Sequence, residues 1–283
     1  MKLKLSCTDF SFPLLEHDRA LAVIALLGFS GADVGLFEGH GHLKPGRELV
    51  KPVRNGAALK RRLAEHGLKA SDIFLQLHAG FTEFAVNHPD AGRREFARDQ
   101  FLRTLDYAGA AGSEHVTILP GVVFEKASRA ASVSRSADEL TWRVGRAKTA
   151  KLQLAVEPHI GSLIDTPERA LDLAGRVPGV GFTLDYAHFT RAGISDSRIE
   201  PLAVRATHMH ARSARKGRLQ SSLKENTIDF GRALKALNQR RFNGWIALEY
   251  VWIDWEHCNE VDVLSETVQL GGHLLAAAKK IGL

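Results

Sequence analysis

The chain of 283 residues contains only two cysteines, Cys7 and Cys258, so it carries neither a disulfide framework nor a cluster of thiolate metal ligands. It also lacks an apolar run of the roughly 18 residues that a membrane span needs. Its most apolar stretch, Leu21 to Phe29, is much shorter, and its first residues show no apolar segment typical of a signal peptide. We therefore expect a cytoplasmic protein without membrane attachment.

Glycine-rich phosphate-binding motifs are absent as well, because neither GxGxxG nor a Walker-type sequence occurs. The formal net charge is +6, but the basic residues are spread along the chain. Such a distribution is typical of solvated helix faces more than of a nucleic-acid-binding surface, and a small anionic substrate would also suit the positive charge. Scattered Gly and Pro residues give no sign of a long linker.

Apolar segments alternate with segments of helical periodicity along the whole chain. We expect helices at residues 20–27, 54–66, 90–109, 136–149, 166–175, 229–240 and 260–280. We expect strands at residues 3–7, 32–39, 72–80, 114–121, 152–159, 179–188, 206–212 and 244–251. Eight strands alternating with helices predict an α/β fold, a single-domain (β/α)₈ TIM barrel over residues 1–283. A doubly wound open sheet is the alternative, but its nucleotide-binding forms carry a glycine-rich turn that is missing here.

Acidic and imidazole side chains follow four successive strands, at the ends where such barrels place their chemistry. Glu157 ends LQLAVEPH, Asp185 ends GFTLD, His210 lies in ATHMHAR and Glu249 in WIALEY. Because side chains alternate along a strand, these four can share the face that points into the barrel mouth. Buried carboxylates repel one another, and a divalent cation resolves that conflict. The mostly oxygen donor set favours Mn²⁺ or Mg²⁺, with Co²⁺ or Zn²⁺ possible.

Each of these residues also has a purely structural interpretation. Asp185 could cap a following helix, the glutamates could form salt bridges, and His208 and His210 could be hydrogen-bonded core residues. Of the two histidines, His210 lies nearer the strand tip and is the better candidate ligand, whereas His208 would support it from deeper in the barrel.

The order Glu, Asp-x-x-His (DYAH), His-x-His (HMH) and a last Glu resembles the xylose-isomerase-like TIM barrel superfamily of sugar isomerases and epimerases. The resemblance covers nearly the whole chain. It implies that Glu157, Asp185, His210 and Glu249 are metal ligands and that His188 points at the substrate. It also implies a substrate-binding arginine after the seventh strand; Arg212, Arg215 and Arg218 all lie there, and we select Arg215 and Arg218. His159, on the face of Glu157, and His78, near the end of the third strand, complete the predicted substrate-binding set.

The predicted chemistry is proton transfer next to a carbonyl. A metal ion that holds a carbonyl and a neighbouring hydroxyl acidifies the adjacent C–H bond and stabilises an enediolate. Glu157 and Glu249 are the candidate pair that removes and returns the proton. The resemblance implies isomerisation or epimerisation of a keto sugar or sugar acid, and decarboxylation or dehydration of a keto sugar acid could use the same site.

Two other functions fit such a barrel less well. An endonuclease IV-like DNA-repair nuclease would need an Asp-x-His pair after the seventh strand, but Asp229 is followed by Phe230 and Gly231. A barrel that binds a sugar without turnover would not need two opposed carboxylates. We therefore expect a carbohydrate substrate, no nucleic acid and no membrane partner, and a possible homodimer or homotetramer by analogy with the superfamily.

Overall fold

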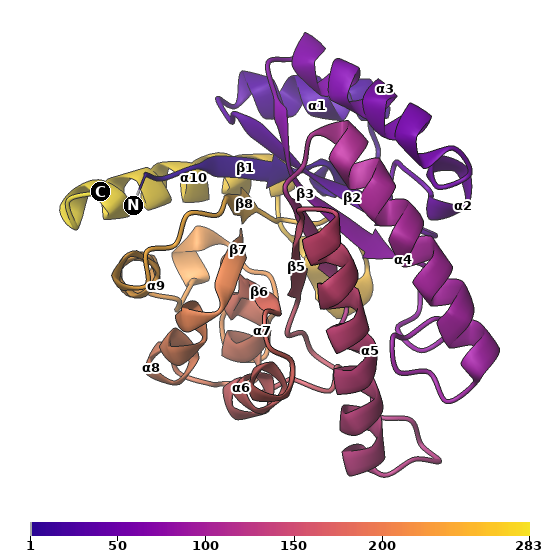
Figure 1. The fold of residues 1–283 in the computed structure, drawn as a ribbon. Coiled ribbons are helices and arrows are strands. Elements are labelled where there is room, and N and C mark those ends of the chain that lie inside the picture. Colours follow the sequence, from indigo (N-terminus) through magenta and orange to yellow (C-terminus); the bar gives the residue numbers. More distant parts are fainter. Residues whose placement is uncertain (1) are drawn as a thin grey trace.

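The computed structural model describes residues 2–283, which form a closed barrel of eight parallel strands (Figure 1). Each strand pairs with its neighbours in the chain, and β8 closes the barrel against β1. The strands are β1 (Leu5–Thr8), β2 (Gly31–Phe37), β3 (Lys69–Gln76), β4 (His115–Ile118), β5 (Gln153–Val156), β6 (Gly181–Asp185), β7 (Ala206–Ala211) and β8 (Ile246–Leu248). The predicted (β/α)₈ barrel is confirmed.

Helices connect the strands and lie outside the barrel (Figure 1). They are α1 (His17–Leu26), α2 (Pro45–Glu48), α3 (Pro52–Glu65), α4 (Ala91–Ala111), α5 (Arg129–Thr149), α6 (Pro167–Arg176), α7 (Tyr186–Arg191), α8 (Asp196–Ile199), α9 (Phe230–Gln239) and α10 (Val263–Lys280). Short 3₁₀ turns add η1 (Asp9–Ser11), η2 (Glu200–Val204), η3 (Leu223–Glu225) and η4 (Trp255–Glu260).

Local sequence signals account for several helix starts. The side chain of Thr166, before Pro167, accepts a hydrogen bond from the Arg169 amide, and Asp229 caps α9 in the same way. Helix α5 begins well before residue 136, where we expected it, because Ser128 caps it through the Ala131 amide. Its first turns, RAASVSR, are largely exposed or half-buried and contain Val133 as their one large apolar residue, so apolar periodicity does not mark them.

The strands are shorter than predicted. Their lengths determine where the polar residues at their C-terminal ends lie. Glu157 follows the last residue of β5, and Glu249 follows the last residue of β8. Residues 186–188 form the first turn of α7 instead of extending β6. Because strands of a closed barrel end at a common rim, these tips come together at its C-terminal mouth.

The inside of the barrel is unusually polar, since such interiors are generally filled by branched apolar side chains. Nδ1 of His115 lies 2.7 Å from Oδ1 of Asp72, and its Nε2 lies 2.9 Å from the hydroxyl of Thr207. The hydroxyls of Thr117 and Thr183 are 2.6 Å apart. The apolar core lies instead between the barrel and the helices, where Leu, Ile, Val and Phe side chains are buried.

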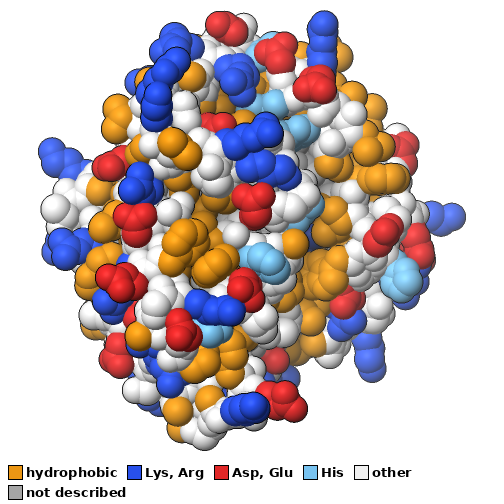
Figure 2. Space-filling view, turned by 90° about the vertical axis from the view of Figure 1, so that its right-hand side faces the viewer, with side chains coloured by type: hydrophobic (Ala, Val, Ile, Leu, Met, Phe, Trp, Pro, Cys, Tyr) orange, Lys and Arg blue, Asp and Glu red, His pale blue; other side chains and the backbone are white. Residues whose placement is uncertain are grey.

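Residues 2–283 contain no helix that is both long and apolar enough to cross a membrane. On the face shown in Figure 2, basic and acidic side chains are interspersed, with histidines and apolar side chains between them. On this face the positive charge is not gathered into one basic patch, as the scattered sequence positions predict.

Candidate metal centre and substrate pocket

A cavity of about 460 Å³ lies at the C-terminal mouth of the barrel. Its polar wall consists of Gln76, Glu157, His159, His188, Arg212 and Glu249, together with His40. Its apolar wall includes Phe10, Phe37, Phe74, Phe81, Val251, Ile253 and Trp255. A cavity of this size, mostly apolar with a few converging polar groups, is typical of small-molecule sites.

Three of the four predicted metal ligands come together. The donor atoms of Glu157, His210 and Glu249 all lie within 4.8 Å of one another, and the three residues are buried. Nδ1 of His210 is 2.7 Å from Oε1 of Glu157 and 3.5 Å from Oε2 of Glu249. Oε2 of Glu249 is buried and accepts no hydrogen bond, and burial raises the pKa of this carboxyl. Such a set of two carboxylates and one imidazole, buried and close together, fits a divalent cation.

Asp185 is placed differently. Its Oδ1 accepts a hydrogen bond of 2.8 Å from the amide of Ala187 and caps α7, so the structural interpretation of this residue is confirmed. Its Oδ2 accepts from Nε and Nη2 of Arg212, at 3.1 and 2.6 Å. The donor atoms of Asp185 approach those of Glu157 and His188 but not the set formed with His210 and Glu249. Its role as a metal ligand remains a prediction.

Arg212 is the loop arginine that lines the mouth cavity. It is buried, and its Nη2 lies 3.1 Å from Oε2 of Glu249 and 3.2 Å from Nε2 of His188. Arg215 and Arg218, selected from the sequence, do not line this cavity. They pair with Glu225 and Glu260 and are 40% and 32% exposed. Their contact with substrate is untested; continuing the strand alternation two residues beyond His210 would have pointed to Arg212.

The predicted substrate-binding histidines differ in position. His188 lines the cavity, and burial together with the Arg212 charge lowers its pKa. His159 also lines it, and burial lowers its pKa too. Because Nδ1 of His159 donates to the carbonyl of Ile160 at 2.7 Å, its Nε2, which is buried without a hydrogen-bond partner, is left as a free acceptor.

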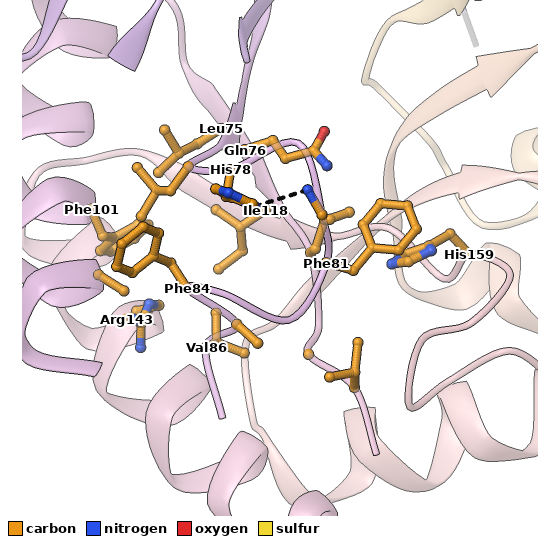
Figure 3. Close-up of a pocket in the computed structure, with 17 residues that line it drawn as sticks. Leu75, Gln76, His78, Phe81, Phe84, Val86, Phe101, Ile118, Arg143 and His159 are labelled. Carbon is orange, nitrogen blue, oxygen red and sulfur yellow. Dashed lines mark hydrogen bonds between the residues drawn. The ribbon is translucent and has the colours of Figure 1, made fainter. Parts of the chain in front are cut away.

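His78 lies outside the mouth cavity and is exposed. Its Nδ1 accepts a hydrogen bond from the amide of Gly80, drawn as the dashed line in Figure 3. It lines a neighbouring cavity of about 50 Å³. His159 and Phe81 also belong to that cavity, and Figure 3 shows their side chains next to each other, with the ring planes tilted by 53°. Their ring centroids are 4.7 Å apart.

Sequence reasoning missed Asp33 of β2, which lies below the predicted ligands. Its Oδ2 is 3.0 Å from Nε2 of His210 and 2.7 Å from Nε2 of His208. His208 therefore lies deeper in the barrel than His210, two residues further from the strand tip, as the alternation of side chains predicts. Asp33 contacts both histidines and so links them. A carboxylate within the apolar run ADVGLF was the available signal, because a charge is buried in a strand only when it has a partner.

The model of the xylose isomerase-like TIM barrel family matches residues 21–270. No curated protein sequence matches the chain significantly. Solved structures similar to it include an L-ribulose 3-epimerase (18% identity, TM-score 0.76, covering 99% of this chain and 97% of that chain). D-psicose 3-epimerase from Clostridium cellulolyticum H10, with D-tagatose, shares 15% identity at a TM-score of 0.76 (97% and 99% covered). A family 2 AP endonuclease from Brucella melitensis shares 18% identity at a TM-score of 0.70 (96% and 99% covered).

Proposed function

The chain belongs to the xylose isomerase-like TIM barrel family, and from this premise we propose that it is a divalent-metal-dependent isomerase or epimerase acting on a keto sugar or sugar acid. The observation that carries the proposal is the pair of buried carboxylates, Glu157 and Glu249, which line one cavity and both approach Nδ1 of His210, at 2.7 and 3.5 Å. Several similar structures are described as sugar epimerases, which supports the substrate class.

Glu157, His210 and Glu249 would hold the cation, with Asp185 as the fourth proposed ligand. A bound divalent ion would polarise a carbonyl and its neighbouring hydroxyl and stabilise an enediolate. The oxygen-rich donor set favours Mn²⁺ or Mg²⁺, with Co²⁺ or Zn²⁺ as possibilities.

The protein's own groups would move the proton and orient the sugar. Glu157 and Glu249 act as the pair that removes a proton from carbon and returns it. Neutral His159 offers Nε2 to a substrate hydroxyl. The aromatic side chains of the opposite wall pack against the apolar face of the sugar and limit access of water.

Return of the proton to the neighbouring carbon gives isomerisation, and return to the opposite face of the same carbon gives epimerisation. Decarboxylation or dehydration of a keto sugar acid is the second candidate, because Arg212 at the cavity wall would favour an anionic substrate. An endonuclease IV-like activity is less well supported, since the Asp-x-His pair of that family is missing after β7. The proposal includes a cytoplasmic enzyme without nucleic-acid or membrane partners, active as a homodimer or homotetramer.

Solvent proton exchange tests the proposed function. The protein is incubated in D₂O with Mn²⁺ and a panel of ketopentoses, ketohexoses and keto sugar acids, and carbon-bound deuterium is measured by NMR. We expect one substrate class to gain deuterium next to its carbonyl, and the Glu157→Gln variant to lose this exchange. Absence of exchange across the panel, or cleavage of an abasic-site duplex, would contradict the proposal.

A further inference from the structure

A second and larger cavity lies at the opposite end of the barrel, where the strands begin. Its volume is about 1050 Å³, against about 460 Å³ for the mouth cavity, and the two cavities have no lining residue in common. Its wall includes Lys69, His115 and Ala206, the first residues of β3, β4 and β7. This cavity, termed the basal basin below, has room for a small molecule and is separate from the proposed active site.

Basic side chains dominate the wall of the basal basin. Glu114 is the one acidic residue that lines it, whereas five basic residues do so: Lys4, Lys60, Lys69, Arg240 and Arg241. Within residues 2–283 none of these five has an acidic partner, in contrast to surface arginines such as Arg198, which pairs with Glu168. The positive charge of the basin is therefore not neutralised by ion pairs of its own.

Helix ends offset only part of this charge. The last residues of α3 and α4, and Arg240 directly after α9, line the basin, so three helix C-termini face it. Each C-terminus carries about half a negative charge, which basic side chains commonly neutralise. Together with Glu114, the three ends offset about half of the five positive charges. An excess of roughly two positive charges remains, and this excess favours an anion as the occupant.

Buried polar side chains also line the basin. Ser71 and His208 belong to its wall and are only 2% and 1% exposed. Oγ of Ser71 and Nδ1 of His208 have no hydrogen-bond partner among the described residues. Because Nε2 of His208 donates to Oδ2 of Asp33 at 2.7 Å, Nδ1 of the neutral ring is left as an acceptor. Buried polar groups are seldom left unpaired, so these two atoms favour a polar occupant of the basin.

We propose that the basal basin is a binding site for a small molecule that carries a phosphate group. A phosphate ester brings close to two negative charges and several acceptor oxygens, which match the excess charge and the Lys and Arg donors. The half-buried ring of Trp245 and the hydroxyl of Ser71 are available to the rest of the molecule. A nucleic-acid backbone held at the rim would leave the buried polar atoms unpaired. The site does not depend on the activity proposed for the mouth.

The test is calorimetry with inorganic phosphate and glycerol 3-phosphate on metal-free protein. We expect both probes to bind, and the ester to bind more tightly because it also reaches beyond the charged residues. The double variant Lys60→Gln/Arg241→Gln should weaken both by at least about tenfold, since two charged donors are lost. Arg61→Gln/Lys235→Gln is the matched control, because these residues of α3 and α9 are equally exposed, carry the same charge and do not line the basin. The control should change the affinity by less than about twofold.

Four results would overturn the proposal. Neither probe binds, or the ester binds no more tightly than inorganic phosphate. The basin variant keeps its affinity, which would place the phosphate elsewhere, for example beside Arg212 at the mouth. The basin variant and the control lose affinity equally, which would indicate a general effect of net charge. A single-stranded oligonucleotide binds more tightly than glycerol 3-phosphate and is lost in the basin variant, which would make nucleic acid the ligand. Circular dichroism of each variant confirms that the fold is kept.

Discussion

Oδ2 of Asp33 lies 3.0 Å from Nε2 of His210, on the side of the imidazole ring opposite Glu157. A carboxylate in this position fixes the ring and holds a proton on Nε2, which leaves Nδ1 for the ion site. Asp33 is buried and does not line the mouth cavity, so it acts on the site through its contact with His210.

Asp33→Asn should therefore weaken Mn²⁺ binding by about 10- to 100-fold, because an amide is a poorer acceptor for the Nε2 proton. Thermal melts with and without Mn²⁺ give the affinity and the stability together. Asp72→Asn is the matched control, since Asp72 is equally buried and pairs with His115 away from His210. Both variants should lose stability, but only Asp33→Asn should lose metal affinity; equal losses of affinity would contradict the positioning role.

Glu157→Gln should reduce turnover by at least about 10³-fold and weaken metal binding while leaving the fold intact. The substitution keeps the shape of the side chain but removes both the proton acceptor and a negative ligand. Circular dichroism checks the fold, and the deuterium exchange assay checks the chemistry. Full activity in this variant would eliminate Glu157 as a catalytic residue.

His159→Phe should raise KM by about tenfold with a smaller change in kcat, because it removes one hydrogen-bond acceptor from the cavity wall. Steady-state kinetics on the substrate found by the exchange screen provides the measurement. His78→Ala serves as the comparison, since His78 is exposed and lies outside the mouth cavity. An equal increase in KM for both variants would restore the substrate-binding role that the sequence predicts for His78.

Arg218 forms an ion pair with Glu260 at the end of η4, the segment that carries Trp255 to the cavity. If it acts by anchoring this segment, Arg218→Ala and Glu260→Ala should raise KM to the same extent. The increase should stay below about fivefold, because an exposed ion pair contributes little. A defect confined to Arg218→Ala would instead identify direct contact with substrate, as the sequence predicts.

The fold was predictable because each strand and most helices carry a repeated local signal. The alternation of apolar strands with amphipathic helices, Thr166 before Pro167 and Asp229 before α9 all act within a few residues. Glu157, His210 and Glu249 could be grouped in advance because a barrel brings its strand ends to one rim.

The remaining site could not be predicted because it depends on contacts across the barrel. Whether Asp185 serves an ion, a helix cap or Arg212 is decided by a side chain 27 residues away in the chain. Arg212, Arg215 and Arg218 are residues of the same type in one segment. The path of the loop after β7 decides which of them reaches the mouth cavity. The contacts of Asp33 with the histidines form because β2 and β7 face each other across the barrel interior. No local sequence pattern indicates that arrangement.

The polar lumen also bears on how the barrel assembles. Asp33 and Asp72 are paired residues of adjacent strands, and each meets an imidazole, on His208 and His115. A strand that docked one residue out of step would turn its carboxylate into the apolar layer under the helices. Barrels with such a register error would therefore be strongly destabilised. These buried pairs thus favour the correct strand register during folding, and they also hold the residues of the mouth in position.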